Sequence, residues 1–485
     1  MRQLTIERAA VIILFALLFA LATFIPLDTD TWWHIRSGEY TLSHGMIYAD
    51  PFSFTKAGEP WTNHSWGSQI ILYTVWRLAG NFGLAIYTSV LATAGMAVVY
   101  RMCAGNVYLR AFALVIGAAT AAVFWSPRPQ MLSFFLSTVI LYLLYLHKRK
   151  GVDRLWWIPV VMGIWGNLHA GFSIGFILLL GSIAGETLGN IFNPQGKSVV
   201  PWSGVRKLAL VTLVSVAALL INPYGLQMLA VPFQTVSIGA LQNFIQEWNS
   251  PNFHERQTWP FVFLLLGLLG AVGGSRLKLD WTDFALASGT AFLALLAGRN
   301  IAVFAVVATP ILTYHLDAIL TERGWVLQPV RHVTPRMARL NLALVALITL
   351  GALAKVLLVL DSARVAREQE ARLPVRVVEH LNDERPPGPM FNSYNWGGYL
   401  MFAAPEYPVF VDGRTDLYGD EFLTTYLQTT TGSPNWRQTL DEYGVNLIVI
   451  EAQSGLARAL DSEPGWQVDY QDEMAVVFVR EGANG

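Results

Sequence analysis

The chain is poor in charge and cysteine and lacks the usual phosphate-binding loops. Only 14% of its 485 residues are charged, against about 25% in an average soluble protein. Its one cysteine, Cys103, excludes an internal disulfide bond and a cysteine-based zinc cluster. No GxGxxG, GxxxxGKS/T or HExxH motif occurs, and the missing phosphate loop argues against an ATP-driven pump.

Long hydrophobic runs, by contrast, are plentiful. Hydrophobic residues make up 53% of the chain, and about 20 in a row suffice to span a bilayer. Eleven runs stand out, at about 8–27, 81–103, 110–126, 131–147, 155–168, 171–189, 207–221, 259–274, 281–298, 301–319 and 340–360. We expect the first to be a retained anchor and residues 67–80 to form an interfacial helix rather than a span. The composition therefore predicts a polytopic α-helical membrane protein with about 11 transmembrane helices.

Charge is divided unevenly along the chain. Residues 1–360 hold 24 basic and 14 acidic residues, whereas residues 361–485 hold 9 basic and 20 acidic ones. With the N-terminus in the cytoplasm, 17 of the 24 basic residues fall in cytoplasmic segments, as the positive-inside rule requires. An odd number of spans then places residues 361–485 outside the cytoplasm. We predict a transmembrane domain at 1–360, with a large outer loop at 28–80, and an extracytoplasmic domain at 361–485.

The acidic tail has the pattern of a small α/β domain. Short apolar runs predict strands at 389–391, 408–411, 445–450 and 474–479. Helical patterns lie between them at 436–443 and 454–460. Loops at 392–399 and 411–416 follow two of these strands, where ligand-facing residues of open sheets usually lie.

The outer loop 28–80 carries the candidates for catalysis. Asp28 and Asp30 open the loop, and paired carboxylates suit a general base or a divalent cation site. The alternative is that one of them caps a helix that starts near Thr31. His34, Glu59 and His64 are further catalytic candidates, although His64 equally suits packing among the neighbouring aromatic residues.

Candidates for substrate binding lie at the predicted outer ends of the spans. Guanidinium groups suit phosphate, and isolated ones occur at Arg128 and Arg299. The alternative for these arginines is snorkelling or pairing with an acid such as Glu247. The remaining candidates are Asn167 and His169 in a tight turn, where hydrogen bonds within the turn are the favoured alternative. Glu247 beside Trp248 is an acid–aromatic pair that suits a sugar ring, and an ordinary surface loop is its alternative. For Asp412 and Arg414 we expect an internal salt bridge in a turn.

Several motifs together resemble a known superfamily. They are Asp30-Thr-Trp-Trp-His-Ile-Arg-Ser-Gly-Glu39, Trp61-Thr-Asn-His-Ser-Trp66, Asn167-Leu-His-Ala-Gly-Phe172, Tyr394-Asn-Trp-Gly-Gly-Tyr399 and Asp412-Gly-Arg414. With the long first loop, about eleven spans and an outer tail, the chain resembles the GT-C membrane glycosyltransferases, and more closely a set of bacterial multi-pass members. The adjacent Asp-Glu pair of the protein mannosyltransferases has no match here.

The resemblance implies transfer of a sugar from a polyprenyl-phosphate donor at the outer face of a bacterial plasma membrane, as part of cell-envelope assembly. It maps the role of base or metal ligand onto Asp28 and Asp30, with Mg or Mn as the expected cation. It maps lipid-phosphate binding onto Arg128, Arg299 or Arg256, and no motif fixes which. The acceptor is an unknown glycan, lipid or protein, and nucleic acid is not expected as a partner. A non-catalytic scaffold that binds lipid-linked sugars or partner proteins is the alternative, and a transporter is a weaker third.

Overall fold

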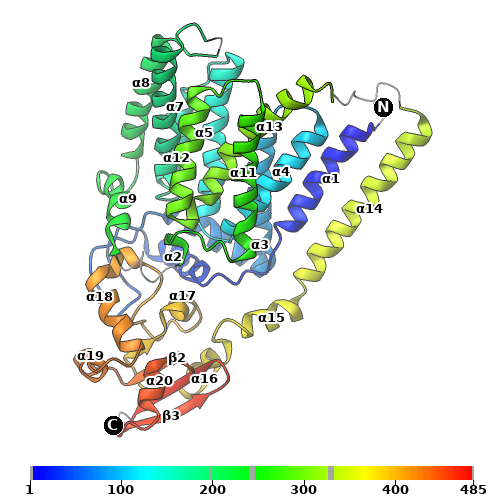
Figure 1. Cartoon of the computed structure of the whole chain (residues 1–485). Coiled ribbons are helices and arrows are strands. Elements are labelled where there is room, and N and C mark those ends of the chain that lie inside the picture. Colours follow the sequence, from blue (N-terminus) through cyan, green and yellow to red (C-terminus); the bar gives the residue numbers. More distant parts are fainter. Residues whose placement is uncertain (1–3, 197, 240–245, 326–332, 483–485) are drawn as a thin grey trace. The chain divides into compact units, whose positions relative to one another are not determined.

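A computed structural model describes residues 4–196, 198–239, 246–325 and 333–482 (Figure 1). The chain divides into two compact units. The first comprises residues 1–24, 85–225 and 245–359, and the second comprises residues 25–84, 226–244 and 360–485. The predicted outer loop and the predicted tail thus fall into the same unit.

The first unit is helical. Its helices are α1 (Ile6–Leu21), the later part of α3 (Trp66–Met102), α4 (Val107–Ala121), α5 (Gln130–Lys150), α6 (Trp157–Gly166), α7 (Phe172–Phe192), α8 (Trp202–Leu219), α11 (Trp259–Gly274), α12 (Trp281–Leu296), α13 (Ile301–Glu322) and α14 (Pro335–Val359). Polar caps set several of the starts: the Asn106 side chain accepts hydrogen bonds from the first turn of α4, and Asp280 does so for α12.

Each of the eleven predicted runs coincides with one of these helices, and the polytopic helical fold class is confirmed. Among the described residues, eight helices are long and apolar enough to cross a membrane. The helices α1, α6 and α12, of 16, 10 and 16 residues, are shorter, so the number eleven is not confirmed. Within α3 the backbone leaves helical geometry at Gly80 (φ 53°), which separates residues 66–79 from the apolar run that begins at 81.

Polar contacts join the ends of helices in this unit. The Lys355 amine, which lies inside the last apolar run, donates to the carbonyl oxygens of Ala20 (2.5 Å) and Thr23 (2.6 Å) after the end of α1. The Ala20 carbonyl also accepts from the Thr23 backbone N–H at 3.3 Å, so the lysine adds to the hydrogen bonds at the end of α1. The contact explains how a cation is accommodated in an otherwise apolar segment.

The second unit contains α2 (Asp30–His44), the start of α3, α9 (Gln227–Ser237) and the α/β tail. The tail holds α15 (Ser362–Glu370), α16 (Val375–Glu384), α17 (Tyr394–Ala403), α18 (Thr415–Thr430), α19 (Trp436–Glu442) and α20 (Gly455–Leu460). Its strands are β1 (Met390–Asn392), β2 (Leu447–Glu451), β3 (Trp466–Gln471) and β4 (Ala475–Arg480), in the order β1-β2-β4-β3. The pair β1 and β2 is parallel, and the other pairs are antiparallel.

Three of the four predicted strands occur. The exception is 408–411, which is not a strand of the sheet: Val409 instead exchanges backbone hydrogen bonds with Phe52 and Phe54 of the outer loop. Trp33, Phe52 and Trp61 from the loop share one apolar core with tail residues such as Trp396. The first outer loop and the tail therefore fold together.

Candidate functional site

The twelve predicted site residues divide between the two units. The five catalytic candidates lie in the second unit and the seven binding candidates in the first. Each group is described within its own unit.

Asp28 and Asp30 stand at the start of α2. The Asp28 carboxylate accepts a hydrogen bond from the Asp30 backbone N–H at 3.0 Å, so Asp28 covers a backbone donor that the first helical turn leaves open. The capping alternative therefore applies to Asp28. The Asp30 carboxylate accepts from the indole N–H of Trp33 at 3.2 Å, which fixes its direction without neutralising its charge.

The tail lies directly against Asp30. A Cβ added at Gly413 would collide with the Asp30 carboxylate and the Trp33 indole nitrogen, and one added at Gly398 would meet the Thr29 carbonyl oxygen at 2.7 Å. Glycine at 398 and 413 thus permits the approach of two tail segments to the start of α2. The Trp396-Gly-Gly398 and Asp412-Gly-Arg414 motifs have this positioning role.

Gly413→Ala should therefore disturb Asp30 and the loop–tail interface together. Adding a methyl group to a filled contact typically costs about 1–3 kcal/mol. We expect lower thermal stability of this unit and faster proteolysis of the tail. Gly289→Ala on α12, where an added Cβ meets nothing within 4 Å, is the control. Equal melting temperatures of Gly413→Ala and Gly289→Ala would show that the Gly413 contact does not constrain the loop.

Arg414 is fully buried and joins the loop to the tail. Its guanidinium pairs with Asp50 of the loop at 2.5 Å and with Asp412 at 2.6 Å. It also packs over the rings of Phe52 and Trp61. Burial disfavours the charged form, but Asp412 and Asp50 outweigh it and hold the pKa of Arg414 above its ordinary value. The predicted salt bridge of Asp412 with Arg414 is confirmed, and Asp50 is a partner that spacing along the chain did not reveal.

The other loop candidates have separate surroundings. His34 is buried, and its Nδ1 lies 3.4 Å from the Gln69 amide nitrogen. Gln69 and Asn63 exchange two amide hydrogen bonds at 2.7 and 2.8 Å, so His34 belongs to a buried polar network. His64 contacts the Ser65 hydroxyl through Nδ1 at 2.9 Å, and Glu59 is exposed.

In the first unit, two arginines lie on either side of one acid. Glu247 is 3.6 Å from Arg128 and 3.9 Å from Arg299, and the Arg299 guanidinium lies 4.0 Å from the centre of the Trp248 ring. The predicted pairing of these arginines with Glu247 is confirmed. Among these three side chains, two cations share one carboxylate, which sums to a charge of +1. Arg128 lies in the loop before α5, and Glu247 and Arg299 lie in short 3₁₀ helices.

Acid should weaken this cluster. Burial favours the neutral carboxyl, but the guanidinium groups of Arg128 and Arg299 outweigh it and hold the pKa of Glu247 below its ordinary 4.5. The resulting stabilisation is complete above that ordinary pKa and is lost as the pH falls through the lower native value. Acid should therefore lower the melting temperature of the wild type below pH 4.5. We expect Glu247→Gln to lack the part of this fall that comes from protonation of Glu247. An identical acid dependence in both proteins would contradict the role of this ion cluster.

His169 accepts hydrogen bonds through Nδ1. The donors are the Gly171 backbone N–H at 3.1 Å and the Ser133 hydroxyl at 2.7 Å, and Ser133 in turn accepts from the Trp165 indole at 2.8 Å. The neutral ring therefore carries its proton on Nε2. The sequence analysis missed Ser133 and Trp165, which lie on separate helices.

The remaining binding candidates are structural or exposed. The Asn167 amide donates to the carbonyl oxygens of Gly163 and Ile221, which closes the turn after α6. Arg256 is exposed in a short turn before α11. A GxSxG pattern at 171–175 starts helix α7 directly after helix α6 rather than after a strand, so it does not form a hydrolase nucleophile turn.

Asp28 and Asp30 are the candidate metal ligands. Within the part of the chain that the structure describes, no three His, Cys, Asp or Glu residues lie close enough to hold an ion. Asp28 and Asp30 offer two carboxylates, and Mg²⁺ is often held by one or two carboxylates together with water and substrate phosphate. The pair fits that pattern.

Comparisons with known proteins were made by sequence and by structure. No family model matches the chain, and no curated protein matches it by sequence. The oligosaccharyltransferase AglB from Archaeoglobus fulgidus, solved with an inhibitory peptide and a dolichol-phosphate, is 12% identical with a TM-score of 0.58, over 92% of this chain and 69% of that one. ArnT from Cupriavidus metallidurans, solved bound to undecaprenyl phosphate, is 13% identical with a TM-score of 0.53, over 98% of both chains.

At such low identity the likeness establishes the fold, and it extends over almost the whole of both chains in the case of ArnT. The helical membrane body, the long first loop and the tail all fall within the aligned range. The chain therefore shares the fold of these two solved membrane proteins, AglB and ArnT.

Proposed function

We propose that this chain is a membrane glycosyltransferase that moves a sugar from a polyprenyl-phosphate-linked donor to an acceptor on the outer face of the membrane. The observation that carries the proposal is the cluster of Arg128, Glu247, Trp248 and Arg299. Its excess positive charge suits a phosphate, which guanidinium groups bind through paired hydrogen bonds. The two solved structures of the same fold were obtained with dolichol-phosphate and undecaprenyl phosphate.

The proposed reaction is a single displacement with inversion. Asp30 takes the proton of the acceptor hydroxyl, whose oxygen forms a bond to the anomeric carbon of the donor sugar. The bond between that carbon and the donor phosphate breaks, and the phosphate leaves with the electron pair. A guanidinium group stabilises the charge on the departing phosphate. Asp30 is favoured over Asp28 because the Asp28 carboxylate binds the backbone at the start of α2, whereas the Asp30 carboxylate accepts a hydrogen bond from the Trp33 side chain. A divalent cation such as Mg²⁺ or Mn²⁺, held by Asp28 and Asp30, would neutralise donor phosphate.

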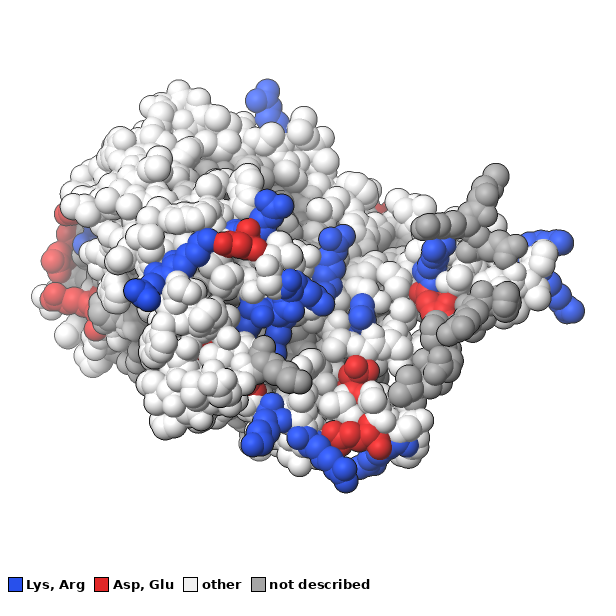
Figure 2. All heavy atoms as spheres, turned by 90° about the horizontal axis from the view of Figure 1, so that it is seen from above, with Lys and Arg blue, Asp and Glu red and all other residues white. Residues whose placement is uncertain are grey.

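The proposed setting is a bacterial plasma membrane with the N-terminus in the cytoplasm and the tail outside. Lys and Arg side chains gather on the face that Figure 2 shows, seen from the end where α1 begins. Positive segments are typical of the cytoplasmic side. The acceptor would be a glycan, lipid or protein of the cell envelope.

Two variants test the donor site. Arg299→Ala removes a charged hydrogen-bond donor, worth about 1.5–3 kcal/mol, and should weaken undecaprenyl phosphate binding about tenfold or more. Glu247→Gln removes the carboxylate that competes for both arginines and should strengthen the same binding. Equilibrium titration of the purified protein with undecaprenyl phosphate measures both effects.

The two variants should change the affinity for undecaprenyl phosphate in opposite directions, and this separates the proposal from its alternative. If the arginines serve only as partners of Glu247, both variants lower stability and neither changes the affinity for the lipid phosphate. That outcome would support a non-catalytic protein with the GT-C fold that acts as a scaffold.

A further inference from the structure

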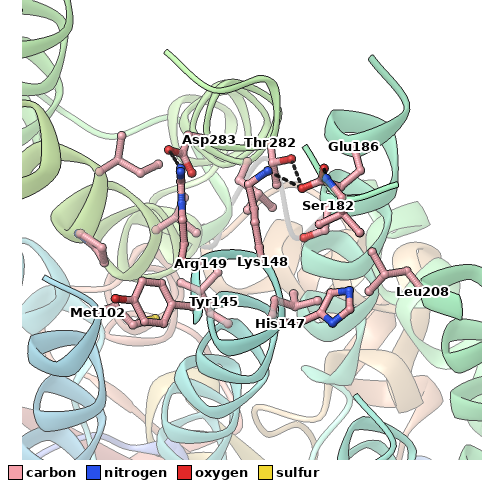
Figure 3. A pocket seen from close by; sticks show the side chains of 17 residues that line it. Met102, Tyr145, His147, Lys148, Arg149, Ser182, Glu186, Leu208, Thr282 and Asp283 are labelled. Carbon is pink, nitrogen blue, oxygen red and sulfur yellow. Dashed lines mark hydrogen bonds and ion pairs between the residues drawn. The ribbon is translucent and has the colours of Figure 1, made fainter. Parts of the chain in front are cut away.

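A cavity lies among the helices of the first unit, away from the arginine cluster of Arg128 and Arg299. It contains about 610 Å³ of empty space, including its open mouth, and is lined by side chains from α3, α5, α7, α8, α12 and α13. Figure 3 shows it from close by, with Tyr145, His147, Lys148 and Arg149 from the end of α5. None of these residues belongs to the site described above.

The cavity has an apolar wall and a charged end. Leucine, valine, isoleucine and methionine side chains form most of the wall, among them Leu141, Leu144, Leu208 and Leu286. At the charged end, Lys148 pairs with Glu186, and Arg149 pairs with Asp283 at 2.5 Å (Figure 3). Lys148 also pairs with Asp280 at 3.0 Å. This combination suits an amphiphile whose apolar chain and polar head need different surroundings.

The charges at this end do not balance. Among the described side chains of this ion-pair cluster, three carboxylates face two cations, a net charge of −1, and none of the five is more than 19% exposed. Four of them line the cavity, and Asp280 lies beside Lys148. An uncompensated charge in poorly solvated surroundings is costly. A ligand that carries an ammonium group would remove that excess.

A positively charged side chain, Lys150, lies at the same end of α5. The Lys150 amine lies 5.6 Å from the centre of the Tyr145 ring, which lines the cavity. His147 Nε2 is buried and makes no hydrogen bond to any residue that the structure describes. Lys150 and His147 are suitable partners for a phosphate next to the ammonium group.

We propose that this cavity binds an aminophospholipid, with an acyl chain along the leucine-rich wall, the primary ammonium near the carboxylates and the phosphate near Lys150 and His147. A primary ammonium donates three hydrogen bonds, whereas the quaternary ammonium of a choline headgroup donates none. A glycerol headgroup brings no positive charge. Binding does not depend on the proposed sugar transfer, since it uses other residues.

Lipid retention by the full-length protein tests this assignment. The purified chain is titrated with dioleoyl phosphatidylethanolamine, phosphatidylcholine or phosphatidylglycerol, and bound lipid is counted by native mass spectrometry. We expect the ethanolamine lipid to bind about tenfold more tightly than the other two, as hydrogen bonds to charged groups imply. Equal binding of the three lipids, or no binding of the ethanolamine lipid, would overturn the proposal.

Three variants locate the site. Leu208→Trp fills the cavity from α8 and should abolish the preferred binding, whereas Leu213→Trp, at a 68% exposed position of the same helix, should leave it unchanged. Asp283→Asn removes the excess negative charge and should bring the affinities for the ethanolamine and choline lipids together, so the proposal stays testable if Leu208→Trp does not fold. Undiminished preference in a folded Leu208→Trp protein, or in Asp283→Asn, would contradict it.

Discussion

Asp30→Asn is expected to lower sugar transfer about 10²–10⁴-fold, the usual contribution of a general base. The amide can still accept the hydrogen bond that Trp33 now donates to Asp30 Oδ1, so the local structure should persist while the group that takes the proton is lost. Release of undecaprenyl phosphate from a panel of undecaprenyl-phosphate-linked sugars measures the effect. Binding of undecaprenyl phosphate should stay close to that of the wild type.

Asp28→Asn is the matched control, because asparagine caps a helix as well as aspartate does. The Asp28 carboxylate contributes a hydrogen bond to the backbone of α2, which an amide oxygen can replace. We expect Asp28→Asn to lower sugar transfer less than Asp30→Asn does, because it keeps the hydrogen bond to α2 and affects only the proposed cation site. A larger loss in Asp28→Asn than in Asp30→Asn would exchange the two roles, and full activity of Asp30→Asn would exclude it as the base.

Arg414→Leu is expected to destabilise the second unit by about 3–5 kcal/mol, as does the loss of one partner from a buried ion pair. The substitution would leave Asp50 and Asp412, both fully buried, without their counter-ion. With a urea dependence of about 1–3 kcal/mol per molar, the tail should unfold at a urea concentration lower by about 1 M or more. Urea unfolding of the full chain in detergent, followed by proteolysis of the tail, reports this midpoint.

The exposed pair of Arg437 and Glu463 supplies the comparison. Arg437 is 57% exposed, and solvent screens such pairs. Arg437→Leu should therefore leave the midpoint almost unchanged. If Arg414→Leu behaved like Arg437→Leu, the buried pair would not be what holds the outer loop to the tail.

Much of the fold was predictable because bilayer spans need long apolar runs, and each run is visible in the sequence. The tail was harder to predict. The strand β3 was missed because its residues are largely exposed or half-buried (Trp466 to Gln471) and carry no apolar pattern. The run 408–411 was wrongly expected to be a strand, because an apolar segment buried against the loop at 52–54 resembles a buried strand.

The site was predictable only where its determinants are local. A helix cap such as Asp28 involves neighbours in the sequence, so the capping role could be predicted as an alternative to catalysis. The pairing of Asp50 with Arg414 joins residues 364 positions apart, and no spacing rule links them. The aromatic and hydroxyl partners of His169 come from different helices and could not be found either.

The most direct test of the central claim compares two ligands that differ by one phosphate. Wild-type protein is titrated with undecaprenyl phosphate and with undecaprenol under the same conditions. The proposed donor site predicts that the phosphate form binds about tenfold or more tightly, and that Arg299→Ala reduces this preference. Equal binding of the two lipids, or no binding of either, would contradict the assignment as a polyprenyl-phosphate-dependent glycosyltransferase.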